Sequence, residues 1–575
     1  MLQKTFIGLV DVLKPVRLPV TAIALGMTAL SAQAQTASEI TPQSFTPSLQ
    51  RLDGSLALSG QAGGPAPAGL ENIGITLSGV DLTDPLPQMT EANDAFVRRL
   101  TRGRIPASEL FEATSDLEAA YAEAGYVLTR VVLPQQTLRD GGKLRVAIVN
   151  GYVEAVDTQR LPPEIRDRVK RLTDGLVNRP GLTRTELERQ LLLSGDVPGT
   201  ALRSGLTAGA APGSTIIGLE ADYQRVTGFA SFGNPTGPEL GRLNLELGGE
   251  LNSALGQGET FYGRISGNYQ GFFSGDPRSR ILAGGMVYPI GRYGTYLNIE
   301  ATTSDTTPDE TPATRSNFDR LSLRLIHPLT RGRQLNLTGQ LALDMQKDDQ
   351  SLLGGAQIYE DQLTILRAGL SLTYLHLDQA FSTASLFLSR GIDALGARTL
   401  ADVGAGTPLS RAGADAIFTK ISGSFSHRRA LSERIGLSVS GRFQSSFGDP
   451  LLTSEQFSLI GSQEVSTMDS GTLRGDSGWV LRSELSTGYP VTIAGRNFQI
   501  SPYLFAGAGQ AILENPTILE QARTKAVFYG IGVDLLSNTN SLFRSSSLRI
   551  EYGRGERDDG IPDENRFSIS GNIRF

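Results

Sequence analysis

The side chains in this sequence that are best suited to chemistry are two runs of acidic residues and three histidines. The acidic runs comprise Asp305, Asp309 and Glu310, and then Asp558, Asp559, Asp563 and Glu564. Carboxylates that a fold gathers can bind divalent cations, but such runs are more typical of solvated loops, and we expect loops here. Cysteine is absent and the histidines are scattered along the chain, so we predict no metal site; they are His327, His376 and His427.

The spacing of catalytic residue types predicts that the protein is not an enzyme. Serine and histidine never occur in a Gly-x-Ser-x-Gly or a His-Glu-x-x-His pattern, the arrangements that activate a nucleophile or a zinc-bound water. The segment Gly553-Arg554-Gly555 lacks the strand–helix context of a phosphate site. A net charge of -6 gives no basic footprint for nucleic acid. We therefore expect neither a cofactor nor a nucleic-acid partner.

The last residues of the chain show how its side chains are positioned. Every second residue from Phe567 to Phe575 is apolar or glycine, and the residues between them are polar. In a soluble protein such a strand lies half-buried on a core. Here it ends a long series of similar segments, which is typical of a transmembrane barrel with alternating lipid-facing and lumen-facing residues.

The composition favours the same architecture. The 575 residues include 39% hydrophobic residues, 66 Gly and 28 Pro, and the apolar residues alternate with polar ones instead of forming continuous core runs. For residues 223–575 we predict an all-β outer-membrane barrel of sixteen antiparallel strands. The expected strands span 224–232, 242–251, 260–267, 280–288, 295–302, 320–326, 333–343, 363–374, 381–390, 418–426, 435–443, 479–486, 497–511, 525–535, 546–554 and 566–575.

The connections between these strands provide an independent check and an orientation. Bacterial barrels have short periplasmic turns and long external loops, and each odd-numbered connection in this strand assignment is longer than the even-numbered one that follows it. We therefore expect the first strand to start at the periplasmic side. Residues 444–478 are expected to contain the longest external loop, and residues 251–259 to span a periplasmic turn.

Four regions are expected before the barrel. Basic residues, an apolar stretch and Ala32-Gln33-Ala34 predict a cleaved signal peptide at residues 1–34, and the stretch is shorter than the roughly 20 residues of a spanning helix. Residues 35–70 are rich in Ser, Gly, Pro and Gln, so we expect a linker with a short helix near residues 46–52. Whether this linker plugs the pore stays open. Helical and strand-like patterns then predict two small α+β domains, at residues 71–157 and 158–222.

Two blocks of sequence in these domains resemble a known family. The residues of the first block are Gly125, Tyr126, Arg130, Pro134, Gln135, Gln136, Asp140, Gly141 and Gly151. They resemble the first POTRA domain of the two-partner secretion transporters, the TpsB family. Pro198 and Gly199 end a segment that resembles the second POTRA domain of that family. We expect the glycines and Pro134 to serve turns and sheet edges.

The resemblance implies an outer-membrane pore with periplasmic POTRA domains that belongs to type V secretion. Such a pore captures an exported, unfolded partner protein of the TpsA kind and passes it to the cell surface without nucleotide. An exposed edge in a POTRA sheet is compatible with capture, because an extended client can pair with it through its main chain. The implied further partners are outer-membrane lipid and, during biogenesis, the barrel assembly machinery, which reads Phe575 as an insertion signal.

One stretch departs from the family pattern. The family carries a Val-Arg-Gly-Tyr/Phe motif in its sixth external loop, followed by a second block. That second block matches Gly475, Asp476, Gly478 and Trp479 here. Counting back from it aligns the loop motif with Val465-Ser466-Thr467-Met468. The motif arginine is therefore missing. A second register would put it at Arg474, but would leave the later block unmatched. Either a specialised loop attachment or drift in a redundant contact explains the loss.

The acidic partner that the family places in a barrel strand is missing as well. The matching segment here is Phe505-Ala506-Gly507-Ala508-Gly509. We expect Ser466 and Gly507 to stand where an arginine–carboxylate pair would be, and losing both charges together to be nearly neutral. Installing both charges should then restore a coupled pair.

Two other functions are compatible with the same sequence. One is an assembly factor that inserts other barrels into the outer membrane, although two POTRA domains are few for that role. The other is a passive channel or surface receptor with vestigial POTRA domains, which the lost loop motif favours.

Overall fold

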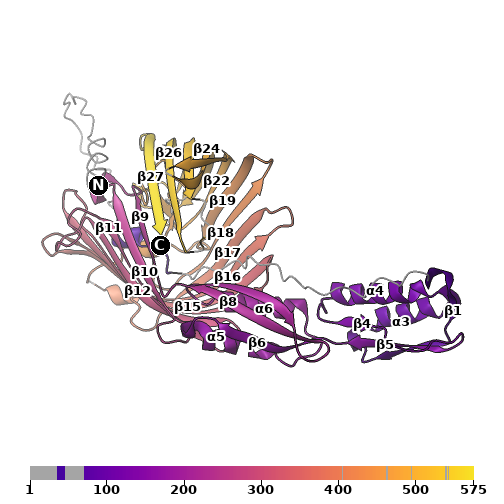
Figure 1. Cartoon of the computed structure of the whole chain (residues 1–575). Helices are drawn as coiled ribbons and strands as arrows, with labels where there is room; N and C mark the ends of the chain where they lie inside the picture. The colour runs from indigo at the N-terminus through magenta and orange to yellow at the C-terminus, as the bar shows by residue number, and fades with distance from the viewer. Residues whose placement is uncertain are drawn as a thin grey trace. The chain divides into compact units, whose positions relative to one another are not determined.

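The computed structural model describes residues 35–45, 70–404, 406–460, 464–493, 495–537, 541 and 543–575. The expected signal peptide and the expected helix near residues 46–52 lie outside these ranges. The described chain starts with a single helical turn, α2 (Ala37–Ile40), and continues into two α/β domains and a closed barrel (Figure 1). Among the described residues, no helix is both long and apolar enough to cross a membrane.

The first domain packs two helices, α3 (Thr90–Leu100) and α4 (Ser108–Glu123), against small sheets. One sheet has the order β2-β5-β4, with β2 parallel and β4 antiparallel to β5, and the other pairs β1 with β3. The strands are β1 (Gly74–Thr76), β2 (Gly79–Thr83), β3 (Arg104–Pro106), β4 (Arg130–Val132) and β5 (Lys143–Val149), and the 3-10 turns are η1 (Leu70–Asn72) and η2 (Pro87–Met89). Leu100, Tyr121 and Val146 lie at the centre of the core and are fully buried.

The second domain repeats this arrangement. Its helices are α5 (Pro163–Thr173), followed by η3 (Asp174–Leu176), and α6 (Arg184–Gly195), and its sheet has the order β6-β8-β7 with β6 (Tyr152–Arg160), β7 (Thr200–Ala208) and β8 (Ser214–Tyr223). Helix α6 begins where it does because Thr183 and Glu186 form a reciprocal capping box. Since β6 pairs with β8, the second sheet begins at Tyr152. The boundary expected after residue 157 therefore falls inside β6.

The rest of the chain forms a closed antiparallel barrel. Strands β22 and β23 are consecutive parts of one strand, since both pair with β24, so the barrel has the sixteen strands that the sequence predicts. It closes where β27 pairs with β9. The strands are β9 (Val226–Gly233), β10 (Asn244–Asn252), β11 (Thr260–Asn268), β12 (Ser279–Ile290), β13 (Thr295–Thr306), β14 (Thr314–Arg331), β15 (Leu335–Leu352), β16 (Gln357–Leu375), β17 (Phe381–Ile392), β18 (Thr419–Ala430), β19 (Ile435–Ser445), β22 (Ser477–Thr487), β23 (Tyr489–Ile493), β24 (Arg496–Ile512), β25 (Arg523–Ser537), β26 (Ser545–Arg557) and β27 (Glu564–Arg574).

The connections carry short elements of their own. The turn η4 (Pro238–Leu240) follows β9, and helix α7 (Leu400–Val403) follows β17. The connection between β19 and β22, residues 446–476, contains the turn η5 (Thr453–Glu455) and a two-stranded pair, β20 (Phe457–Ser458) with β21 (Arg474–Gly475). We call this connection loop 6. It is the long external loop that the sequence predicts.

One predicted external loop is replaced by paired strands. Strands β15 and β16 contain 18 and 19 residues and remain paired up to Ser351 and Gln357, so only residues 353–356 connect them. The predicted alternation of long and short connections therefore fails at the connection between β15 and β16, which is short where a long loop was expected. The reason is that both strands continue past the apolar belt, where the outward side chains of β15 change from Leu341 and Met345 to Lys347 and Asp349.

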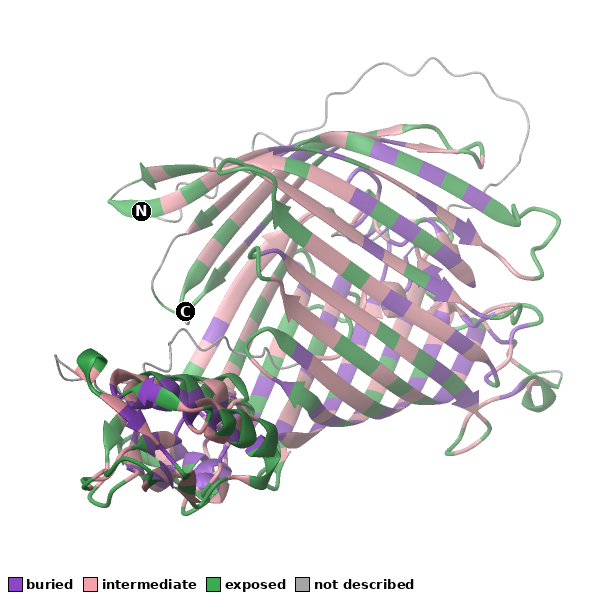
Figure 2. Cartoon of the chain, turned by 90° about the vertical axis from the view of Figure 1, so that its right-hand side faces the viewer, coloured by how far each residue is buried: buried purple, intermediate pink, exposed green. Residues whose placement is uncertain are grey.

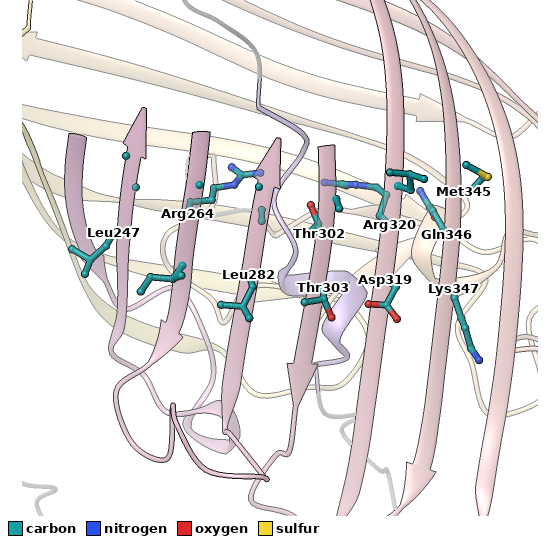
Figure 3. Close-up of a pocket in the computed structure, with 18 of the residues that line it drawn as sticks. Leu247, Arg264, Leu282, Thr302, Thr303, Asp319, Arg320, Met345, Gln346 and Lys347 are labelled. Atoms are coloured by element: carbon teal, nitrogen blue, oxygen red, sulfur yellow. The ribbon is translucent and has the colours of Figure 1, made fainter. Parts of the chain in front are cut away.

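Along many of the barrel strands, more and less buried residues alternate, as Figure 2 shows. Leu341 is 60% exposed on the outer wall, whereas the neighbouring Ala342 is 7% exposed and faces the lumen. The outer wall is hollowed where four small residues form a row across β10 to β13; they are Gly249, Gly263, Gly284 and Ala301. The resulting cavity of about 1130 Å³ is flanked by Leu247 and Leu282 (Figure 3).

Candidate functional site

Residues 35–45 lie against the inner wall of the barrel. The Ala37 amide donates a hydrogen bond to Ser316 Oγ at 3.1 Å, and the hydroxyl oxygens of Thr41 and Ser304 are 2.6 Å apart. Ala37 is completely buried, and Gln35 and Thr36 are nearly so. The segment therefore occupies the lumen next to β13 and β14, and we call residues 35–45 the plug.

The second half of the plug, residues 41–45, has no regular secondary structure and is held by arginines. Arg264 donates to the Gln43 carbonyl oxygen at 3.2 Å, and Arg320 donates to the Pro42 carbonyl oxygen at 3.1 Å. Both side chains point toward the segment that runs past them in Figure 3. Further along β14, Arg324 donates to the Phe45 carbonyl oxygen at 2.5 Å.

The carboxylate of Glu300 also binds the second half of the plug. Glu300 on β13 accepts from the Phe45 amide at 2.9 Å and from the Tyr262 hydroxyl at 2.9 Å. The Phe45 ring lies 4.4 Å, centroid to centroid, from the Tyr262 ring. These residues were not predicted from the sequence, although charged residues at lumen-facing positions of a barrel strand are a signal that would have found them.

The plug is also tied to loop 6. Glu39 of α2 forms an ion pair with Arg474 of β21, and both side chains are largely buried. Arg474 additionally donates to the Gly471 carbonyl oxygen at 3.2 Å within the loop. The plug and loop 6 therefore share a buried ion pair.

Loop 6 is anchored inside the barrel by two fully buried carboxylates. Asp476 accepts from the amides of Leu451 at 2.9 Å and Glu514 at 2.7 Å, and it forms an ion pair with Arg411. Glu455 lies 2.7 Å from the Arg367 guanidinium and 2.8 Å from Lys420 Nζ. Each buried charge thus has its counter-charge, which a buried ion pair requires in order to be stable.

A third anchor involves an arginine of the barrel wall. Arg482 on β22 is 1% exposed at its side chain, lies 2.6 Å from Glu551 of β26, and donates to the Glu464 carbonyl oxygen of loop 6 at 3.1 Å. Its guanidinium lies 3.5 Å from Ser466 Oγ and stacks 4.0 Å above the Phe505 ring. An arginine–carboxylate pair is therefore present at the loop, but the arginine comes from the wall instead of the loop.

This geometry corrects the expectation that Ser466 and Gly507 face each other in place of a charge pair. Gly507 lies opposite Arg482 in the β22–β24 register, and a Cβ there would collide with the Phe528 ring and the Leu481 carbonyl oxygen. An aspartate at residue 507 has no room. Position 507 is glycine because the wall is tightly packed there, and the acidic partner is Glu551.

The comparisons with known proteins fit this architecture. The sequence model of the haemolysin secretion/activation protein family, ShlB/FhaC/HecB, matches residues 213–534, which is more than half of the chain. The chain belongs to this family. A model of the ShlB-type POTRA domain matches residues 76–151. The protein is thus an outer-membrane transporter of two-partner secretion, with its POTRA domains in the periplasm.

Solved structures share the fold. CdiB from Escherichia coli aligns with a TM-score of 0.71 at 20% identity, covering 91% of this chain and 94% of that chain. CdiB from Acinetobacter baumannii aligns with a TM-score of 0.62 at 15% identity, covering 100% of this chain and 97% of that chain. No curated protein sequence matches the chain. At these identities the likeness establishes a common fold.

In this ShlB-family transporter, the first POTRA block occupies turns and sheet contacts. Gly125 and Gly141 have positive φ angles of 96° and 80°, which favour glycine. Asp140 accepts from the Thr76 amide at 2.7 Å, and Gln136 bonds to both the amide and the carbonyl of Arg145, at 2.9 and 2.7 Å. Among the remaining residues of the block, Tyr126 borders the core and Gly151 lies against the Leu128 carbonyl, where a Cβ would not fit. Arg130 forms an ion pair with Glu118, and the Pro134 carbonyl accepts a hydrogen bond from Gln136. Gln135 is exposed.

The loop-6 block has mixed roles in the transporter. Val465 and Met468 join the apolar cluster beneath the loop, and Thr467 is buried beside them. Asp476 is the ion-pair hub described above, while Trp479 is 43% exposed on the outer wall. Three glycines are required by close packing: a Cβ on any of them would meet a backbone atom of a neighbouring strand, and they are Gly475, Gly478 and Gly509.

The second POTRA domain is joined to the barrel by contacts that the sequence did not indicate. Gly199, which follows Pro198 and has a φ angle of 70°, accepts a hydrogen bond from the Gln224 amide at 2.7 Å. Gln224 lies shortly before β9. Asp196 forms a bidentate ion pair with Arg331 of β14, at 2.6 and 2.8 Å. Arg168 donates to the Gly291 carbonyl at 2.5 Å. Burial lowers the pKa of Arg168 to about 10, with Arg171 adding to the effect, so its guanidinium stays protonated at neutral pH.

Two of the histidines lie together, contrary to the expectation that all three are scattered. His376 Nε2 and His427 Nδ1 each lie 2.8 Å from the Ser382 hydroxyl, because β17 and β18 are neighbours and the turn after β16 folds back onto them. Among the described residues, no group of three or more potential ligands gathers into a metal site.

Proposed function

We propose that this transporter rests in a closed state and opens when residues 35–45 and loop 6 leave the lumen to let an unfolded client pass. The observation that carries the proposal is the plug itself, which contacts β13, β14 and loop 6 through hydrogen bonds and the Glu39–Arg474 ion pair. Most contacts involve polar side chains that water or a client's main chain can replace. The transport step needs no covalent chemistry from this chain.

We further propose that the first POTRA domain captures the client along β2. The sheet order β2-β5-β4 leaves two edge strands, β2 and β4. The β4 edge is obstructed, because the Val131 amide already donates to Glu118 Oε2 at 3.0 Å. Strand β2 lies at the other end of the sheet, where an extended client can add a strand through main-chain hydrogen bonds.

Disulfide trapping tests the capture step, because the chain contains no cysteine and any introduced cysteine is unique. Asp81→Cys places a thiol on β2, and Glu112→Cys places a matched thiol on the exposed face of α4. A client carrying one cysteine in its N-terminal region is expected to crosslink to Cys at position 81 and not at position 112. Equal crosslinking at both positions, or normal secretion after deletion of residues 72–150, which leaves β6 intact, would contradict capture by this domain.

A further inference from the structure

We propose that Arg264, Arg320, Arg324 and Glu300 form a binding site for the main chain of any extended polypeptide, and that the client uses this site after the plug has left. This inference rests on the proposed function and names the chemistry by which the lumen holds its substrate. We call the four residues the main-chain clamp.

Among the described residues, the hydrogen bonds between the clamp and the plug all go to backbone atoms of the plug. The arginines of the clamp donate to the carbonyl oxygens of Pro42, Gln43 and Phe45. Glu300 accepts from the Phe45 amide. Every residue other than proline carries the same amide and carbonyl groups, so these four hydrogen bonds do not depend on the sequence of the bound segment.

The sequence-specific contacts of the plug lie on other residues. The hydroxyl of Thr41 meets Ser304 at 2.6 Å, and the hydroxyl of Ser44 meets Ser322 at 3.3 Å. A client lacking these hydroxyls loses those two contacts and keeps the main-chain ones. The lumen thus holds its own plug more specifically than it holds a passing chain.

The geometry of the clamp fits an extended chain. Arg320 and Arg324 are four residues apart on β14, a rise of roughly 13 Å along the strand. They bind carbonyls three residues apart, Pro42 and Phe45, and an extended segment of this length spans roughly 10 Å. The long guanidinium side chains bridge the difference. The bound segment therefore runs alongside β14 from Arg320 to Arg324.

The clamp also has spare capacity for hydrogen-bond acceptors. Glu300 lies within 3.3 to 4.0 Å of all three guanidinium groups, so one carboxylate serves three cations. Their side chains are only 14%, 11% and 5% exposed, and Glu300 is fully buried. Within the part of the chain that the structure describes, the Nε atoms of Arg264, Arg320 and Arg324 have no hydrogen-bond acceptor. Carbonyl oxygens of a passing chain are the acceptors that such a site favours.

The test measures block of ion current by peptides in planar bilayers. The protein used is the full transporter lacking residues 35–45, and its folding is checked by heat-modifiability. Three probes with amidated C-termini are compared: a peptide with the sequence of residues 35–45, a permuted version, and a version with ester linkages after residues 42 and 43 that weaken two of the carbonyl acceptors bound by the clamp. The first two are expected to block at concentrations within about threefold of each other. The ester peptide should require on the order of tenfold more, since a hydrogen bond from a charged donor is weakened.

Variants assign the effect to the clamp. In the background lacking residues 35–45, Arg324→Gln should raise the blocking concentration of both amide peptides by about tenfold. The matched control is Arg280→Gln, which removes an arginine on β12 that pairs with Asp305 on the outer wall. Both amide peptides should block the Arg280→Gln variant at the same concentrations at which they block the protein without this substitution. Block by the natural sequence alone, or equal block by the ester peptide, would overturn the inference and leave a plug-specific site.

These outcomes are separate from the test of the proposed function. A transporter that secretes its client, but whose block is insensitive to ester linkages, contradicts the clamp alone. A transporter that shows main-chain-dependent block, but no secretion, contradicts the proposed function alone.

Discussion

Arg482 illustrates how a single residue links the wall of this barrel to its longest loop. Its guanidinium contacts Glu551 at 2.6 Å and Glu484 at 2.8 Å, and it reaches the Glu464 carbonyl in loop 6. The loop segment Val465-Ser466-Thr467-Met468 supplies no charge of its own. An arginine of the wall contacts the loop instead, and the sequence did not indicate this contact between two distant elements.

This arrangement predicts coupling between Arg482 and Glu551. Glu551→Gln and Arg482→Gln should each destabilise the barrel by about 1.5–3 kcal/mol, because each leaves a buried charge less compensated. The double variant should lose less than the sum of the two, with a coupling energy of about 0.5–3 kcal/mol. The measurement is a double-mutant cycle on the thermal unfolding of the purified barrel.

A matched cycle on an exposed pair serves as the control. Arg203 and Asp222 of the second POTRA domain lie 3.0 Å apart with side chains 70% and 67% exposed. That pair should contribute about 0–1 kcal/mol. Strict additivity at Arg482 and Glu551 would show that the wall pair does not hold the loop.

Phe575 has two separable roles at the residue scale. Its amide and carbonyl both bond to Gly228, at 2.9 and 2.8 Å, and its ring covers that glycine on the outer wall. Phe575→Ala should keep the seam between β27 and β9 and lower the amount of inserted protein, if the assembly machinery reads the ring. Deletion of Phe575 should also lower thermal stability, because it removes the two main-chain hydrogen bonds. The two variants are compared by membrane fractionation and heat-modifiability, and equal insertion of Phe575→Ala and wild type would contradict the role as a signal.

At the scale of elements, the ion pair between α2 and loop 6 should control the closed state. Glu39→Gln removes the charge that faces Arg474 and leaves the hydrogen bond from Thr36 to residue 39 possible. Open events in planar bilayers should become about tenfold more frequent, since a charge-assisted hydrogen bond of roughly 1.5 kcal/mol or more is lost in the closed state.

The control for this variant is Glu433→Gln, which removes an exposed carboxylate from the turn between β18 and β19. Its open probability should equal that of the wild type. An unchanged open probability in Glu39→Gln would mean that the pair does not hold the pore shut.

The elements also show what the sequence can and cannot predict. Each predicted barrel strand has a counterpart because alternation of apolar and polar residues follows directly from a wall between lipid and lumen. Helix α3 was missed, although Phe96 and Leu100 are spaced as neighbours on one helix face, because most of its other residues are polar. Pairing beyond the membrane, as in β15 and β16, leaves no apolar signal. Contacts between distant segments, such as Glu39 with Arg474, depend on closure of the whole barrel and have no local signature.

At the scale of the whole molecule, the second POTRA domain is bonded directly to the base of the barrel. Arg331 binds Asp196, and Arg189 donates to the Pro328 carbonyl at 2.8 Å. The connection between β8 and β9 is only residues 224 and 225, and the amide of Gln224 is already bonded to Gly199. Protease should therefore cleave near residue 222 slowly.

Weakening this joint should expose the connection. Asp196→Asn is expected to increase the rate of cleavage near residue 222 several-fold, whereas Asp167→Asn, which removes an exposed carboxylate on α5 away from the cleaved sequence, should not. Mass spectrometry of the released periplasmic fragment gives the rates. Equal rates in the two variants would show that the Asp196–Arg331 pair does not hold the domain to the barrel.

The central claim is that residues 35–45 must leave the lumen for the pore to conduct. The most direct test is a disulfide between Thr41→Cys and Ser304→Cys, whose native hydroxyl oxygens are 2.6 Å apart in a chain without other cysteines. Current through planar bilayers is measured before and after reduction, with each single cysteine variant as a control. We predict that the oxidised protein stays closed and that reduction restores the openings of the wild type. Openings of normal frequency and size in the fully oxidised protein would contradict the account.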